Sequence, residues 1–146
     1  MKVSTKGRYG LMVMMELASC FGQGPVQAGT IADNQDISRN YIHILLGGLK
    51  AAQLVRAVRG ASGGYELTRH PRKITVLDVV QALEGHGWPV ACVDHGEGCP
   101  RSKTCAARDV WGELADAMEK VLSGISLEQL VKRQRAKSDK EMMFHI

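Results

Sequence analysis

Long apolar runs are missing from this sequence, and aromatic residues are few. It contains no stretch of about 18 uninterrupted apolar residues, the length that a membrane-spanning helix requires. Aromatic residues make up only 5% of the chain but hydrophobic residues 45%, so the core must consist mainly of Leu, Val, Ile, Met and Ala. The sequence also lacks a Ser-His-Asp set, a P-loop and a dinucleotide fingerprint. These absences argue against a membrane protein and against an enzyme.

Residues 1–24 combine a basic start with an apolar stretch, as a signal peptide does. However, Glu16 interrupts the stretch, Arg8 lies close to it, and no clean small-residue cleavage site follows. We therefore expect the first helix of a cytoplasmic protein. The length of 146 residues suits one domain, or one domain with a dimerising extension.

Positive charge is concentrated in the first half of the chain. Residues 1–75 hold ten Lys and Arg against four Asp and Glu, whereas residues 76–146 hold nine against eleven. The overall net charge of +4 is weak evidence for any partner. A basic module followed by a mildly acidic one, however, indicates that the first half binds a polyanion.

The first half of the chain has the pattern of a winged helix-turn-helix. Residues 9–21 predict a mostly buried helix, residues 30–35 a short second helix, and Ser38 caps a third helix that reaches about Gln53. Two helices joined by a tight turn form a helix-turn-helix, whose second helix enters the major groove of DNA. Two short strands around a glycine-rich tip at 59–64 then predict a wing.

The second half is predicted to be helical around one irregular segment. Thr75 caps a helix that ends near Gly85, and a long helix runs from about Cys105 to Leu122. A stripe on the long helix, spaced three and four apart, suits a partner helix; it consists of Trp111, Leu114, Met118, Val121 and Ile125. Ser126 caps a short last helix.

The predicted fold class is mainly α with a small two-stranded β wing: a winged helix-turn-helix followed by a long C-terminal dimerisation helix. We divide the chain into a DNA-binding domain at 1–75, a cysteine segment with dimerisation helices at 76–134, and a mobile charged tail at 135–146.

The predicted DNA contacts lie on the third helix and the wing: Ser38, Arg39, Asn40, His43, Lys50, Arg59, Gly60, Ser62 and Gly63. Asn40 suits an adenine edge and His43 a guanine acceptor. Lys50 and Arg56 suit phosphates, and Arg59 beside a glycine-rich tip suits a minor groove. Alternatively, these cations form an ordinary solvated face. The order of the features along the chain favours a DNA interface.

Three cysteines lie close together in the irregular segment. Cys92, Cys99 and Cys105 have C-x6-C-x5-C spacing, and thiolates are the usual ligands of iron–sulfur clusters. Zinc is a second interpretation, although the paired C-x2-4-C pattern is absent. A thiol switch, a disulfide and inert cysteines also remain open. Cys20 lies in the apolar run of the first helix and is expected to be structural.

The sequence resembles the iron–sulfur winged-helix regulators typified by IscR, NsrR and RirA. The resemblance extends from residue 1 to about residue 133 and is carried by STKGRYGL at 4–11, by the helix-turn-helix at 36–55, by VRGASGGYELTR at 58–69, and by the cysteine trio. It implies a cytoplasmic homodimer that binds palindromic promoter sites on double-stranded DNA. It also implies a [4Fe–4S] or [2Fe–2S] cluster whose state changes DNA affinity, and which aerobic preparation can remove.

The sequence departs from these relatives at the fourth ligand and in the recognition helix. IscR-like members use a histidine three residues after the third cysteine, where this chain has Arg108, and NsrR-like members use an aspartate at the position of Arg8. IscR-like members also have a glutamate at the position of His43. The candidate fourth ligands here are His95, Asp94, Glu97 and Asp109, besides water or a small thiol. We thus expect a regulator controlled by a cluster on three cysteines, or a cluster-free thiol- or metal-responsive repressor of the same fold.

Overall fold

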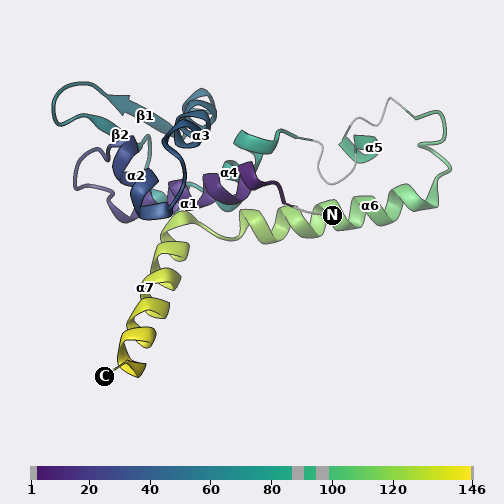
Figure 1. Ribbon diagram of the computed structural model, residues 1–146. Helices are drawn as coiled ribbons and strands as arrows, with labels where there is room; N and C mark the ends of the chain where they lie inside the picture. The colour runs from purple at the N-terminus through teal and green to yellow at the C-terminus, as the bar shows by residue number, and fades with distance from the viewer. Residues whose placement is uncertain (1–2, 87–90, 95–98, 146) are drawn as a thin grey trace.

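The computed structural model describes residues 3–86, 91–94 and 99–145 (Figure 1). Its elements follow in the order α1 (Thr5–Ser19), α2 (Ala28–Gln35), α3 (Arg39–Ala51), β1 (Val55–Val58), β2 (Gly64–Leu67), the 3-10 turn η1 (Pro71–Lys73), α4 (Val76–Glu84), α5 (Ala91–Asp94), α6 (Ala106–Ser123) and α7 (Leu127–Phe144). The fold class is therefore the predicted one. None of the helices in the described part is long and apolar enough to cross a membrane.

The core is aliphatic, as the scarcity of aromatic residues predicts. Its fully buried side chains come from α1, α2, α3 and α4 and include Met14, Ile31, Leu45 and Val79. Leu127 at the start of α7 is also fully buried in the same cluster. The core of the basic half thus includes side chains from beyond residue 75, while the domain boundary at that residue stays a prediction.

Helix α1 begins four residues earlier than the sequence pattern predicts. Ser4 is its N-cap and accepts a hydrogen bond from the Gly7 amide at 3.2 Å. The same amide donates to Glu84 Oε1 at 3.1 Å, and the Ser4 hydroxyl also hydrogen-bonds to this oxygen. A carboxylate at a helix N-terminus is favourable because it faces unpaired amides and the positive end of the helix dipole.

The helix-turn-helix is built as predicted. Asp36 ends α2 in the left-handed region at φ 52°, which is a conformation that Asp tolerates better than most residues. Ser38 then caps α3 by accepting a hydrogen bond from the Tyr41 amide at 3.3 Å. On α1, Glu16 accepts hydrogen bonds from Asn34 at 2.6 Å and Gln35 at 2.8 Å, so α2 is tied to α1.

Strands β1 and β2 form an antiparallel hairpin with Val55 opposite Leu67 and Val58 opposite Gly64. Tyr65 also exchanges two backbone hydrogen bonds with Val26, both 2.8 Å long. Hence the wing is joined to the segment between α1 and α2, and its base is fixed to the body.

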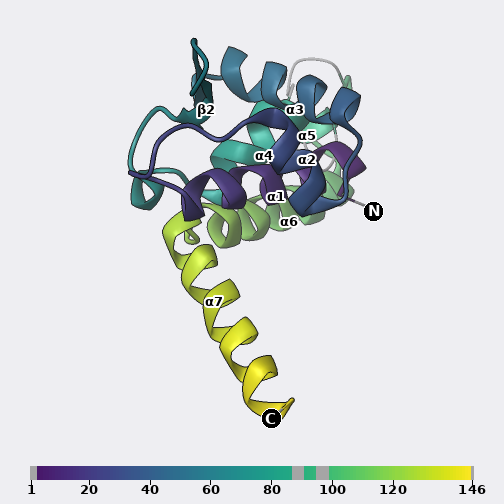
Figure 2. The same ribbon diagram turned by 60° about the vertical axis from the view of Figure 1, so that its left-hand side comes forward.

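In the second half of the chain, the starts of α4 and α7 lie next to each other, and α6 lies between them in the sequence. Thr75 and Asp78 form a capping box at the start of α4, and Ser126 and Gln129 form another at the start of α7. The two caps lie side by side, because Thr75 and Ser126 form an antiparallel bridge flanked by two backbone hydrogen bonds of 2.9 Å. Between them, α6 extends away from the body (Figures 1 and 2).

The predicted end of the last helix is wrong. Instead of stopping near residue 134, α7 continues to Phe144 and projects from the body (Figure 2). Residues 135–144 contain no Gly or Pro and are rich in good helix formers, so nothing in them stops the helix. An i,i+4 ion pair between Glu128 and Lys132, 3.2 Å long, adds to its first turns.

Candidate DNA interface and cysteine segment

The N-terminal turn of α3 presents polar side chains to solvent. Ser38, Arg39, Asn40 and His43 are all exposed, as a helix that reads the major groove requires. Arg39 forms an ion pair with Asp33 of α2 at 3.7 Å, with both side chains 70% exposed. Such an exposed pair contributes only about 0–1 kcal/mol, so Arg39 can exchange Asp33 for a phosphate at little cost.

Ile44 is a surface residue of α3 that the sequence analysis missed. It is 58% exposed, four residues after Asn40 and on the same side of the helix. An exposed isoleucine on this face suits apolar contact with a thymine methyl group. Helical spacing alone could have identified it, because α3 buries Ile42, Leu45 and Leu49 on the opposite side.

In the wing, Arg59 is exposed and the tight turn at the tip depends on glycines. Arg59, Gly60 and Ser62 are exposed at the tip, and Gly60 has a φ of 114°, which few residues other than glycine adopt. A Cβ added to Gly63 would overlap the carbonyl of Val58. Gly63 is therefore required by the packing of the hairpin as well as by any approach to DNA.

A basic hollow lies between the end of α3 and the wing. Its cationic lining residues are Lys50, Arg56, Arg59 and Arg69. The structure changes the expected role of Arg56, because Glu66, its cross-strand partner in the hairpin, pairs with it at 2.7 Å. Since Arg56 is already partly neutralised, Lys50 and Arg59 are the better candidates for phosphate contacts in this hollow.

The described residues 91–94 and 99–105, which carry the three cysteines and are called the cysteine segment below, are attached to the first turn of α6. Cys92 is half-buried on α5, Cys99 is exposed at the start of a hydrogen-bonded turn, and Cys105 is the half-buried N-cap of α6. Arg108 donates a hydrogen bond from Nε to the Cys92 carbonyl at 3.0 Å. Within the described ranges, the cysteines are not gathered with other donors into a metal-binding group.

Of the four candidate fourth ligands, only the side chain of Asp109 lies in the described part of the structure. Asp109 lies exposed on the first turn of α6. His95 and Glu97, like the side chain of Asp94, lie outside what the structure describes. Arg108, where IscR-like relatives have histidine, instead holds the backbone of Cys92. Cys20 ends α1 as a half-buried free thiol, far along the chain from the other three.

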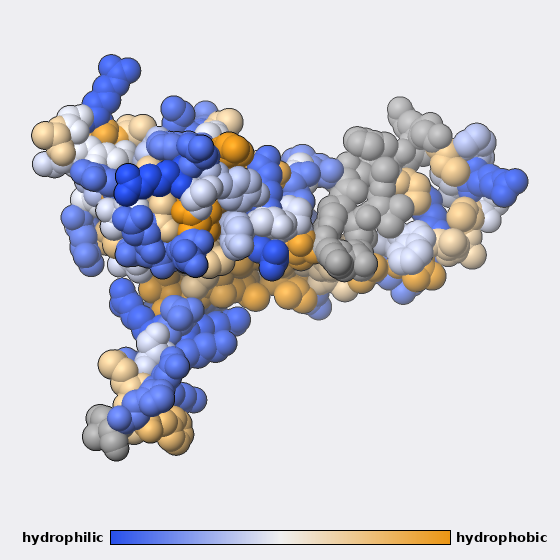
Figure 3. All heavy atoms as spheres, viewed as in Figure 1, coloured by the Kyte–Doolittle hydropathy of each residue, from blue (hydrophilic) through white to orange (hydrophobic). Residues whose placement is uncertain are grey.

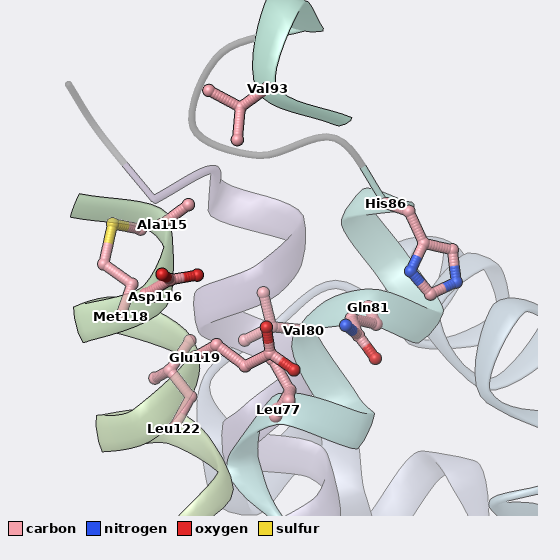
Figure 4. A pocket seen from close by; sticks show the side chains of 10 residues that line it. All are labelled: Leu77, Val80, Gln81, His86, Val93, Ala115, Asp116, Met118, Glu119 and Leu122. Carbon is pink, nitrogen blue, oxygen red and sulfur yellow. The ribbon is translucent and has the colours of Figure 1, made fainter. Parts of the chain in front are cut away.

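A hollow between α4, α5 and α6 adjoins the cysteine segment (Figure 4). Leu77 and Val80 of α4 line one side of it and Met118 and Leu122 of α6 the other, while the Glu119 side chain extends from α6 toward α4 (Figure 4). The space between the body and the long helix is thus lined by apolar side chains together with the polar side chains of Gln81, His86, Asp116 and Glu119.

These features can be compared with known proteins. A family model described as Rrf2, iron-dependent transcriptional regulator, matches residues 3–133. The chain belongs to the Rrf2 family of transcriptional regulators. The named relatives of this Rrf2 protein are regulators of transcription and not enzymes, and the winged helix-turn-helix implies that it binds DNA.

Two kinds of Rrf2 regulator are among the similar proteins. CymR of Bacillus subtilis is 41% identical over 130 residues, covering 89% of each chain. Its solved structure, described as the global cysteine regulator, has a TM-score of 0.76 and covers 91% of this chain and 98% of that one. IscR of Xenorhabdus nematophila is 35% identical over 134 residues, covering 92% and 81%. A solved T. potens IscR also has a TM-score of 0.76, at 38% identity, covering 92% of this chain and 88% of that one.

Proposed function

We propose that this Rrf2 regulator is a cytoplasmic homodimer, acting as a repressor or dual regulator, that binds palindromic promoter sites with an affinity controlled by an iron–sulfur cluster on Cys92, Cys99 and Cys105. The observation that carries the proposal is the attachment of the cysteine segment. Arg108 ties the Cys92 backbone to the helix that Cys105 begins, so the segments bearing these two thiols are held together.

The donor set fits a cluster in its chemistry. Three free thiols lie on one short segment, and the Cys105 side chain makes no capping hydrogen bond, which leaves it available as a ligand. When bound, a cluster would supply a centre sensitive to iron supply, oxidants or nitric oxide. The cysteine segment would hold it beside the first turn of α6.

The homodimer is supported by the surface of α6. None of the described side chains of this 18-residue helix is buried, yet Val110, Trp111 and Val121 are 59%, 40% and 60% exposed. Hydrophobic residues gather along the lower side of α6 in Figure 3. An amphipathic helix that finds no core in its own chain requires a partner, and a second copy supplies the same stripe. A two-fold dimer would present two copies of α3 to a palindromic site.

Anaerobic spectroscopy combined with DNA binding tests the proposal. Protein purified without oxygen should be brown, and Mössbauer spectra should give the cluster type. Cys92→Ala, Cys99→Ala and Cys105→Ala should each remove the visible absorption, whereas Cys20→Ala is the matched control and should retain it. DNA affinity should differ between loaded and cluster-free protein at one fixed salt concentration. Colourless protein with one zinc per chain would refute the proposal.

A cluster-free regulator that responds to a thiol or metal is the second candidate. Similarity to CymR, described as a cysteine regulator, and the exposed thiol of Cys99 favour it. It predicts colourless protein that binds DNA tightly and loses or gains affinity on treatment with thiol oxidants. Cys99→Ala should then abolish the response without changing the affinity of the reduced protein.

A further inference from the structure

The last turn of α4 packs on two helices through two glycines. Leu83 is only 5% exposed and reaches between α1 and α3. A Cβ added to Gly10 of α1 would overlap Leu83 Cδ1, and one added to Gly48 of α3 would lie 3.0 Å from Leu83 Cδ2. Each methyl group of one leucine therefore rests on a glycine, and one of these glycines belongs to the predicted recognition helix.

Glu84, the next residue, holds the N-terminal end of α1, one turn before Gly10. Its carboxylate accepts hydrogen bonds from the Ser4 hydroxyl and the Gly7 amide, and a Cβ at Gly7 would overlap Oε1. The end of α4 is thus fixed to α1 by polar contacts while Leu83 contacts α3. Because protein interiors are close-packed, a shift of this turn must move its neighbours.

The cysteine segment follows this turn along the chain. Gly85 ends α4 with a φ of 82°, and Cys92 follows seven residues later. Along the chain, Cys92 is only nine residues from Leu83, which packs on Gly48 of α3. This turn is therefore the connection along the chain between Cys92 and the residues that pack on α3.

We propose that Leu83 and Glu84 are positioning residues: they set the orientation of α3 on α1 and transmit the state of the cysteine segment to the DNA-reading face. The role of these residues in orienting α3 can be tested by DNA binding alone. The transmission part rests on the proposed sensing function. An allosteric link requires two distinct sites and a difference in affinity between two states. The two sites here are the cysteine segment and the DNA-reading face, and the end of α4 is the packed element that connects them.

The test compares Leu83→Val with Val79→Ala, a control that also shortens a fully buried side chain of α4 but is not among the atoms close to Gly10 or Gly48. Valine keeps an aliphatic side chain but cannot reach both glycines. Leu83→Met keeps the length of the side chain but, being unbranched, can contact only one of the two glycines. Fluorescence anisotropy at fixed salt gives the DNA Kd of each reduced, cluster-free variant, and circular dichroism gives its melting temperature.

In the reduced protein, Leu83→Val should raise the DNA Kd several-fold more than Val79→Ala does, and Leu83→Met, which keeps one of the two contacts, should give a Kd between those of the wild type and Leu83→Val. Equal Kd values for the Leu83→Val and Val79→Ala variants would overturn the positioning role. This arm needs no cluster, so it can fail while the sensing function stands.

The second arm measures the ratio of Kd values between loaded and cluster-free protein. Allosteric ratios are commonly about 5- to 150-fold. Leu83→Val and Glu84→Gln should bring the ratio close to 1, while Val79→Ala leaves it at the wild-type value. An unchanged ratio in both variants would overturn the transmission. A wild-type ratio of 1 would instead refute the sensing function, and the transmission with it.

Discussion

Gly47 and Gly48 are adjacent in α3 but occupy opposite environments, which gives a sharp prediction. Gly47 is exposed, and outside its own helix no described atom lies within 4 Å of where its Cβ would be. Glycine in an exposed helix interior costs about 0.8–1.0 kcal/mol relative to alanine. Gly47→Ala should therefore stabilise the protein by about that amount, which corresponds to a rise of about 2–4 °C in melting temperature for a chain near this size.

DNA affinity should move in the other direction. Gly47 lies seven residues after Asn40 and three after Ile44, on the side of α3 that we assign to the major groove. A methyl group there would separate the helix backbone from the DNA. If the loss is about 1.4 kcal/mol, the Kd rises about tenfold. Stability and affinity should thus change with opposite signs in one variant.

The measurement uses thermal unfolding and anisotropy at matched protein and salt concentrations, with Gly48→Ala as the control. At Gly48 the new Cβ would lie 3.0 Å from Leu83, and overpacking of a core typically costs about 1–3 kcal/mol. Gly48→Ala should therefore fail to raise the melting temperature. If Gly47→Ala stabilises the fold but leaves DNA affinity unchanged, this face of α3 does not contact DNA. If both variants melt alike, the packing described for Leu83 is wrong.

Three further outcomes are expected. Arg59→Ala should weaken DNA binding markedly and leave the sedimentation coefficient unchanged, whereas Arg56→Ala should weaken binding less because Glu66 already pairs with Arg56; equal losses would contradict the ion pair's effect. Gly63→Ala should lower both the melting temperature and DNA affinity, because its Cβ would overlap a backbone carbonyl, and an unaltered melting curve would show that the hairpin tip adapts. Trp111→Asp on the apolar stripe of α6 should yield monomers in analytical ultracentrifugation, and a variant that stays dimeric would exclude this stripe as the interface.

Local signals in the sequence were sufficient for most of the fold. The caps at Ser38, Thr75 and Ser126 are short-range hydrogen bonds between neighbouring residues, so their pattern is visible in the chain itself. Ser4 is a cap of the same local kind that the prediction of α1 did not use, whereas the part of the cap that Glu84 supplies is 80 residues away from Ser4. Contacts at that separation leave no periodic signal.

The same distinction applies to the candidate site. The exposed N-terminal turn of α3 follows from helical spacing, and so would Ile44 if the buried positions had been used to find the opposite face. In contrast, the pairing of Arg56 with Glu66 depends on the register of the hairpin. The hydrogen bond from Arg108 to Cys92 depends on how the cysteine segment folds back on α6. Neither can be obtained from residue types and spacing alone.

The bridge between Thr75 and Ser126 has a consequence for how such a regulator can change. After the Thr75 cap the polypeptide forms α4, which packs in the core, and only then leaves the body; it returns at the Ser126 cap, where the two backbones are hydrogen-bonded to each other. Lengthening a loop whose ends are already joined costs little, because the closure entropy grows only with the logarithm of its length. The stretch between the end of α4 and Ser126 can therefore gain, lose or exchange residues while the two anchor points stay in place. One DNA-reading scaffold can in this way accept sensing segments of different length and chemistry.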